Sequence, residues 1–189
     1  MARKYELRKR AERLEETRRR IVEAAVELHT TAGPARTSIA AVAERAGVQR
    51  HTVYAHFPDL PSLYAACSSH WEAQNPFPDA SAWFALEDPE RRLRAALDDV
   101  YAWYERVEPA LALFLRDASL VPEDAAIMDE QAAQLKELAA ALADGFGRRG
   151  ARAAIGHALE FETWRSLVRR QGLSRADAVD AMARLATGA

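Results

Sequence analysis

Cysteine and histidine are scarce in this sequence, which has one Cys and five His among its 189 residues. The lone Cys67 cannot form an internal disulfide, and the histidines are too scattered to form a cluster with metal-ligand spacing. Gly-rich phosphate loops, nucleophile elbows and HExxH patterns are also missing. We therefore expect no metal, no cofactor and no enzymatic activity. Carboxylates such as Asp117 and Glu162 are expected to be surface groups or members of ion pairs.

Residues that favour β-strands are also few, because Val, Ile and Thr together account for only 21 residues, beside 41 Ala. This composition argues against a sheet protein. The longest apolar run, residues 110–115, is far shorter than the roughly 20 residues that span a bilayer. The basic N-terminus has no apolar segment behind it, as a secretory signal would require. These absences predict a cytoplasmic protein without a membrane-embedded part.

Charge is unevenly distributed, although the net charge is only −2. Residues 1–60 carry 12 Lys and Arg against 8 Asp and Glu, whereas residues 61–189 carry 14 against 20. Nine basic groups lie in the first 20 residues: Arg3, Lys4, Arg8, Lys9, Arg10, Arg13, Arg18, Arg19 and Arg20. This basic end is the candidate contact for a polyanion, and the alternative is a solvated, partly frayed arm.

Helical periodicity predicts three helices in the first 60 residues, over about residues 13–32, 38–46 and 49–57. Thr37 is the expected N-cap of the second helix, and Gly47 suits the left-handed position that follows a helix. Pro58 ends the third helix. Two short helices joined by a glycine-containing turn form a helix-turn-helix unit.

About nine helices are expected in all, so the predicted fold class is all-α. The further six begin near residues 60, 89, 110, 122, 151 and 174. Asp59 is the expected N-cap of the first of them, and Pro109 is expected to break a helix that starts at Pro89. The helix that begins at residue 151 is expected to run unbroken to about residue 171.

The third helix carries the most informative pattern. If Val48, Val53 and Phe57 face the core, the polar side chains between them project outward. A helix with such a face fits the major groove of DNA. Arg50 has the fork geometry to pair with guanine, and Thr52 can contact a base or a thymine methyl group. Tyr54 and His56 have the reach for phosphate oxygens.

The run of residues 37–48, TSIAAVAERAGV, together with TVYAHF at 52–57 and PDLPSL at 58–63, resembles the N-terminal DNA-binding domain of TetR-type transcriptional regulators. The resemblance covers residues 17–64. It implies a DNA-binding set made of Thr37, Gln49, Arg50, His51, Thr52, Tyr54 and His56. Two departures from the family pattern stand out. Gln49 occupies a position where a Ser or Thr cap is usual, and Leu60-Pro61 replaces a Lys-Glu pair whose cation commonly touches a phosphate. The basic arm before Thr17 is a candidate replacement for that contact.

The resemblance also implies that the C-terminal part binds a ligand and dimerises. Large rings are frequent there, and the two readings are an apolar ligand pocket and an ordinary core. The preferred pocket residues are Tyr101, Tyr104, Phe114, Met128 and Phe161. His157 and Arg116 are the polar groups to watch, with a surface or interface role as the alternative.

Apolar side chains on more than one face of the last two helices suggest a four-helix dimer interface, as the family forms. The expected interface residues are Ile155, Leu159, Trp164, Leu167, Val168, Val179 and Met182. The predicted organisation is a basic N-terminal arm (1–16), a helix-turn-helix domain (17–60) and a helical effector-binding and dimerisation domain (61–189).

The function expected from these features is a homodimeric, ligand-responsive transcriptional regulator. It would be a repressor that releases a palindromic double-stranded DNA operator when a small apolar or aromatic effector binds. The main alternative is a helical DNA-binding or protein-interaction module that a partner protein controls without any effector. A small helical enzyme acting on an apolar substrate is a third reading, which no catalytic motif supports.

Overall fold

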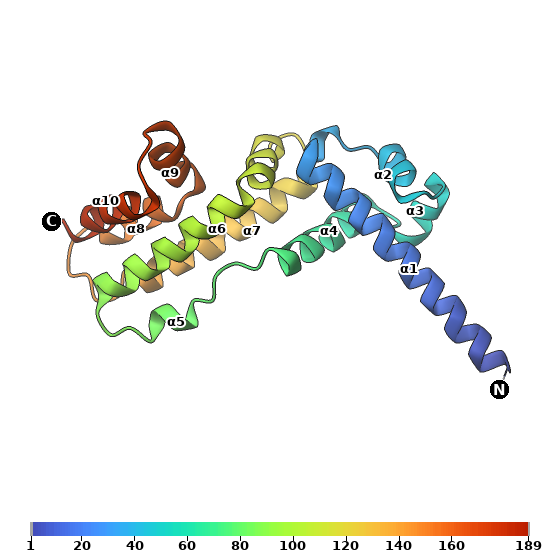
Figure 1. Cartoon of the computed structure of the whole chain (residues 1–189), viewed down its shortest axis with the longest axis horizontal. Coiled ribbons are helices and arrows are strands. Elements are labelled where there is room, and N and C mark those ends of the chain that lie inside the picture. Colours follow the sequence, from blue (N-terminus) through green and yellow to red (C-terminus); the bar gives the residue numbers. More distant parts are fainter. Residues whose placement is uncertain (1, 189) are drawn as a thin grey trace. The chain divides into compact units, whose positions relative to one another are not determined.

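The computed structural model describes the backbone of residues 2–188 and the side chains of residues 5–123 and 125–188. Over this range the chain forms ten α-helices, a 3-10 turn and a π-helical turn, without a strand, so the all-α prediction is confirmed (Figure 1). The chain divides into two compact units. The first holds the residues up to Pro76 together with Pro109–Met128, and the second holds Phe77–Glu108 and the residues from Asp129 onward.

The first unit contains the predicted helix-turn-helix motif. Its helices are α1 (Ala2–Thr31), η1 (Pro34–Arg36), α2 (Ile39–Ala46), α3 (Arg50–His56) and α4 (Leu60–Gln74). The end of α6 and the start of α7 complete this unit. The sequence-based boundary near residue 60 therefore differs from the structural one, because α4 and a later segment of the chain both belong to the first unit.

Two local expectations in this unit were wrong. Helix α1 begins at Ala2 and not near Arg13, so the basic arm is helical. Its residues are mostly strong helix formers, and an i,i+4 pair between Arg8 and Glu12 supports it (3.2 Å). The N-cap of α2 is Ser38, whose side chain accepts from the Ala41 N–H. Thr37 instead donates its hydroxyl to the Gly33 carbonyl at 3.0 Å.

The second unit is built on helices that are longer or more broken than expected. They are α5 (Ser81–Phe84), α6 (Pro89–Asp117), α7 (Pro122–Leu142), α8 (Ala151–Leu159), α9 (Phe161–Arg165), the π-helical turn η2 (Ser166–Arg170) and α10 (Arg175–Thr187). Ion pairs join α6 to α10, for example Arg94 to Asp180 and Arg175 to Glu105, both at 2.9 Å. Ser174 caps α10 as expected, accepting from Asp177 N–H.

Two breaks were placed wrongly in this part of the chain. Pro109 lies inside α6 and does not end it. Buried apolar side chains on both sides, Val107 and Leu111, hold the helix together across the missing N–H donor. The expected single helix from residue 151 is interrupted at Glu160, whose extended backbone (φ −70°, ψ 137°) separates α8 from α9. The short α5 was not predicted.

None of the described helices combines the length and apolar character that crossing a lipid bilayer requires. Within the same residues, no group of three or more His, Cys, Asp or Glu side chains is placed to hold a metal ion.

Candidate nucleic-acid interface

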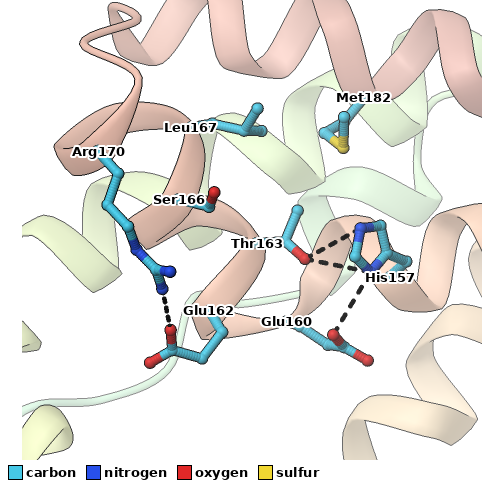
Figure 2. Close-up of a pocket in the computed structure, with 8 residues that line it drawn as sticks. All are labelled: His157, Glu160, Glu162, Thr163, Ser166, Leu167, Arg170 and Met182. Atoms are coloured by element: carbon cyan, nitrogen blue, oxygen red, sulfur yellow. Dashed lines mark hydrogen bonds and ion pairs between the residues drawn. The ribbon is translucent and has the colours of Figure 1, made fainter.

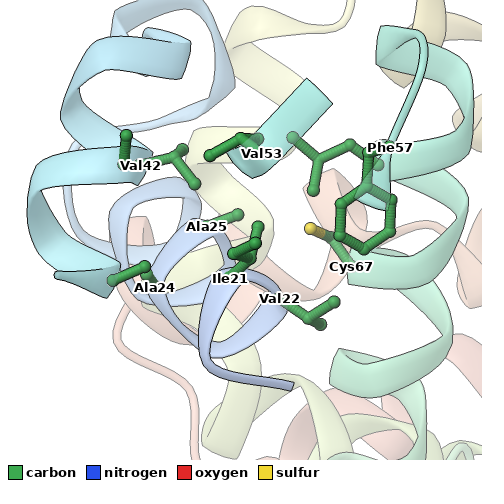
Figure 3. Close-up of a cluster of buried hydrophobic side chains, with 11 residues drawn as sticks. Ile21, Val22, Ala24, Ala25, Val42, Val53, Phe57 and Cys67 are labelled. Carbon is green, nitrogen blue, oxygen red and sulfur yellow. The ribbon is translucent and has the colours of Figure 1, made fainter. Parts of the chain in front are cut away.

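The orientation of α3 is set by a compact apolar core in the first unit (Figure 3). Val53 of α3 and Phe57, the residue that follows this helix, are buried in one cluster with Val42 of α2 and Ile21 of α1. Val48, in the turn before α3, packs against the same cluster. The inward face expected for this helix is therefore confirmed, and the remaining side chains of α3 are left on its outer face.

The turn between α2 and α3 depends on Gly47. This residue has φ 65° and ψ 39°, a left-handed conformation that costs a side chain about 1–2 kcal/mol. Its N–H bonds to the Ala43 and Glu44 carbonyls and so closes α2. Gln49 begins α3 without a side-chain cap, as its departure from the family pattern implied. Asp59 caps α4 by accepting from Ser62 N–H at 2.8 Å.

Two arginines of α1 hold the ends of α2 and α3. Arg20 donates to the Ala46 carbonyl at the C-terminus of α2. Arg18 donates to the His56 carbonyl at 3.3 Å, and its guanidinium lies 4.3 Å from the centre of the Phe57 ring. Cations at helix C-termini oppose the negative end of the helix dipole. In the sequence both residues belong to the nine basic groups of the first 20 residues, and no local signal separates them from the others.

The outer face of α3 contains the predicted DNA-reading side chains. Gln49, Arg50, His51 and Tyr54 are exposed, with Tyr54 48% accessible, whereas Thr52 and His56 are half-buried. In the described part of the chain, no side-chain hydrogen bond or ion pair engages Arg50, His51 or Tyr54. Thr37 is half-buried and its hydroxyl is already used by Gly33. Six of the seven predicted residues are thus on α3 or at its N-cap, and Thr37 precedes α2.

Two titratable side chains are buried within the first unit and are uncharged at neutral pH. Burial lowers the pKa of His29 to about 4, and its ring lies 4.9 Å from that of Tyr64. Burial raises the pKa of Cys67 to about 12. A neutral imidazole and a protonated thiol fill space in the core and offer no reactive group to solvent.

The C-terminal end of α6 is tied to the segment that leads into α2. The Asp117 carboxylate, 2% exposed, accepts from the Ala35 N–H at 3.1 Å and from the Arg116 guanidinium at 2.7 Å. Arg116 also donates to the Ala32 carbonyl at 3.0 Å. The guanidinium and then the amide hold the pKa of Asp117 below its ordinary value, against the effect of burial. A side chain at Gly33 (φ 99°) would collide with the Arg116 guanidinium and the Asp117 carboxylate.

Of the two roles expected for Asp117, a surface group or a member of an ion pair, the structure shows the ion pair, and it also buries the carboxylate. Arg116 was considered as a polar group for a ligand site, and the structure gives it two partners within the first unit. We refer to this arrangement as the Arg116–Asp117 contact. Because it pairs residues more than 80 positions apart, no local sequence pattern could have indicated it.

The predicted ligand residues separate into two groups. Tyr101, Tyr104 and Phe161 belong to a buried aromatic cluster of the second unit that includes Trp164. The two tyrosine hydroxyls donate to the Ala158 and Leu159 carbonyls, at 2.8 and 2.6 Å, and so complete the C-terminus of α8. Phe114 and Met128 belong to the first unit, where Phe114 makes an edge contact with Trp71.

The expected dimer residues also separate into two groups, of which the first is buried within a single chain. A single chain buries Ile155, Leu159, Trp164 and Val179, leaving them at most 7% exposed. The physical reason is the break at Glu160, which lets α8 and α9 present different faces to one core. Leu167, Val168 and Met182 are half-buried and remain available to a second chain.

A groove of about 420 Å³ lies beside two of these residues, Leu167 and Met182 (Figure 2). Leu167 and Met182 line it together with polar side chains of α8, α9 and η2. Among them, Thr163 lies 3.3 Å from the His157 ring, and Arg170 pairs with Glu162 at 2.5 Å. Most of this lining is charged or polar, which differs from the apolar pocket that the sequence suggested.

Comparison with known proteins bears on the first unit. Residues 21–67, which include α2, α3 and the residues that pack them, match the family model for bacterial regulatory proteins of the tetR family. The chain carries a tetR-family DNA-binding domain. The resemblance noted in the sequence is therefore confirmed, and the protein is a DNA-binding transcriptional regulator. No curated sequence matches the chain.

Solved structures extend the likeness to the whole tetR-like fold. A transcriptional regulator from Rhodococcus sp. Rha1 has a TM-score of 0.63 and 22% identity, covering 90% of this chain and 94% of its own. The multidrug binding protein EbrR has a TM-score of 0.61 and 22% identity, covering 90% of this chain and 89% of its own. The fatty acid degradation regulator FadR from Bacillus halodurans has a TM-score of 0.60 and 17% identity, covering 90% of this chain and 94% of its own. These likenesses establish the fold.

Proposed function

We propose that this tetR-family protein is a homodimeric repressor that releases a palindromic operator when a small, largely apolar molecule binds its C-terminal part. The family domain carries the DNA-binding and regulatory role. Beyond that role, we propose four features: repression, a palindromic operator, a homodimer and a small apolar effector.

The observation that carries the proposal is the outer face of α3. Arg50 is exposed and has no partner in the described chain, so its fork can pair with guanine O6 and N7. Thr52 takes a neighbouring base, and Tyr54 and His56 contact phosphate oxygens. The fixed ends of α2 and α3, held by Arg20 and Arg18, keep this face in one orientation.

Two findings support a largely apolar effector. Tyr104, Phe161 and Trp164 pack together in the second unit, with ring centres 5.3–5.7 Å apart. Similar folds include one described as a multidrug binding protein and one described as a fatty acid degradation regulator. Aromatic surroundings with few polar groups are typical of sites for such compounds.

The dimer is proposed to form through the remaining apolar surface of η2 and α10. Leu167, Val168 and Met182 are half-buried in the single chain, and Leu185 is 45% exposed. A two-fold interface makes the paired α3 helices read half-sites about 34–36 Å apart, which is one turn of DNA. An effector that changes this separation would release the operator.

The test has two parts. Selection from randomised duplexes with the purified protein should return an inverted repeat whose half-sites are one helical turn apart. A thermal-shift screen of apolar and aromatic compounds should then find ligands that raise the melting temperature and weaken operator binding. Selection of an inverted repeat with no ligand in the screen would favour control by a partner protein. Failure to select any DNA sequence would contradict the proposal as a whole.

A further inference from the structure

The first half of α1 lies outside the core of the first unit. The buried residues that α1 contributes begin at Ile21, whereas every described side chain from residue 5 to residue 16 is exposed. We call residues 5–17 the N-terminal extension. In Figure 1 it continues α1 beyond the other helices of its unit. Because none of its described side chains is buried, packing in the core does not explain why this charged segment is helical.

Many basic side chains of this region already have partners. Arg8 pairs with Glu12 at 3.2 Å, and Arg19 pairs with Glu16 and Glu23 at 2.8 and 2.7 Å. Arg18 and Arg20 bind backbone carbonyls of α3 and α2. Among the described side chains of residues 5–20, three cations are left without a hydrogen bond or ion pair: Lys9, Arg10 and Arg13.

The three free cations lie on the side of α1 that meets the helix-turn-helix motif. Arg13 precedes Arg20 by seven residues, nearly two full turns, so both point in the same direction. Lys9 and Arg10 lie four and three residues before Arg13 and extend the same face. Arg20 reaches Ala46, next to the turn that leads into α3. Glu6 also lies on this side, but the three cations outnumber it, so the face keeps a net positive charge.

The length of the extension suits a run of phosphates. At about 1.5 Å per residue, Lys9 lies roughly 16 Å from Arg20 along the axis of α1. One DNA strand carries a phosphate every 3.4 Å or so along the helix axis, so the basic face spans about five of them.

We propose that the N-terminal extension is a second DNA-contacting element that binds the phosphate backbone flanking the bases read by α3. The proposal rests on DNA binding through α3. Lys9, Arg10 and Arg13 act by displacing counterions, so the contact adds affinity on any flanking sequence and leaves base preference unchanged. Arg8 and Arg19, held by carboxylates, take no part.

The alternative partner for this helix is a second copy of the chain. Leu14 lies seven residues before Ile21 and Leu7 seven before Leu14, so both continue the apolar stripe that is buried farther along α1. They are 52% and 60% exposed. Two leucines make a narrow contact, whereas the cations form a continuous face, and DNA is the partner that the family domain already implies.

A matched pair of variants tests the proposal. Arg10→Ala/Arg13→Ala removes two free cations, and Arg8→Ala/Arg19→Ala removes two paired ones from the same helix with the same change in net charge. Alanine keeps the helix, which circular dichroism verifies. Binding is measured at several salt concentrations on two duplexes: the sequence selected with the parent protein, and that sequence with five added base pairs at each end.

The parent should bind the longer duplex more tightly, and the Arg10/Arg13 variant should lose this preference. The variant's salt slope should fall by about 1.8 per bound protomer, since each phosphate contact contributes about 0.9, while the Arg8/Arg19 variant keeps the parent slope. Equal slopes and equal flank dependence in both variants would overturn the proposal while leaving operator binding intact. A Leu7→Ser/Leu14→Ser variant should keep the flank dependence. Dissociation of the dimer together with loss of the flank dependence would show that the extension binds a second copy of the chain instead. A parent protein that selects no DNA contradicts the proposed function instead.

Discussion

Arg50 is the exposed fork donor on the recognition helix, and its environment makes a sharp prediction. Arg50→Ala should lower specific DNA affinity by about 1–3 kcal/mol per half-site and relax base preference at one position. Arg50→Lys keeps the charge but loses the fork, so it should retain nonspecific affinity and still lose the preference. Site selection and titration on the selected duplex measure both effects. An unchanged consensus for both variants would remove Arg50 from the base-reading residues.

His29 makes the stability of the first unit depend on pH. Its pKa is about 4 in the folded chain, against about 6.5 when unfolded, so the unfolded state binds more protons between these values. The stability that its neutral form contributes is complete above pH 6.5 and is lost as the pH falls toward 4. Between pH 7.5 and pH 5 the loss should be about 2 kcal/mol. Urea unfolding should show this loss in the parent, and His29→Gln should reduce it; an equal pH dependence in both proteins would show that another group is responsible.

Trp164 and Leu167 lie three residues apart but should respond differently to a carboxylate. Trp164 is fully buried, and its indole N–H has no hydrogen-bond partner in the described chain, so Trp164→Glu should unfold the second unit. Leu167 is half-buried, so Leu167→Glu should fold, run as a monomer and bind a full operator poorly. Circular dichroism and light scattering on the same samples separate these results. A folded Leu167→Glu dimer would remove η2 from the proposed interface.

Short helices with strong end signals were predicted well from the sequence. The turn at Gly47, the cap at Asp59 and the inward face of α3 all depend on local chemistry that a few neighbouring residues specify. The three misplaced boundaries depend on more than local chemistry. Side-chain pairs extend α1, buried residues beyond Pro109 keep α6 continuous, and only packing against one core reveals the turn at Glu160.

The candidate site was predictable to the same degree. Helical spacing predicts that Val53 and Phe57 face inward, and both are buried in the core. The side chains between them are therefore left on the outer side of α3. The supporting roles of Arg18 and Arg20 could not be read from the sequence, because charge alone does not show which arginine meets a helix end. The burial of four expected dimer residues within one chain could not be read from the sequence either, because it depends on the break at Glu160.

At the scale of the whole chain, the first unit depends on a segment that comes much later in the sequence. Asp117→Ala should remove the acceptor of the Ala35 N–H and lower the free energy of unfolding of this unit by about 1–3 kcal/mol. Asp117→Asn keeps an acceptor and should lose less. Urea unfolding, followed by a probe in the first unit, measures both. Equal stability of the parent and the alanine variant would mean that the Arg116–Asp117 contact contributes nothing to the unit.

The same contact has a consequence for synthesis and for chimeric regulators. Ala35 leaves the ribosome 82 residues before its partner Asp117, so the DNA-binding end of a nascent chain stays incomplete until α6 has been made. A fusion that transfers only the residues up to Pro76 to a foreign C-terminal part would leave the Ala35 N–H without its carboxylate. A transplant that also brings residues 109–128 would supply it, so the exchangeable module of this protein is discontinuous in sequence.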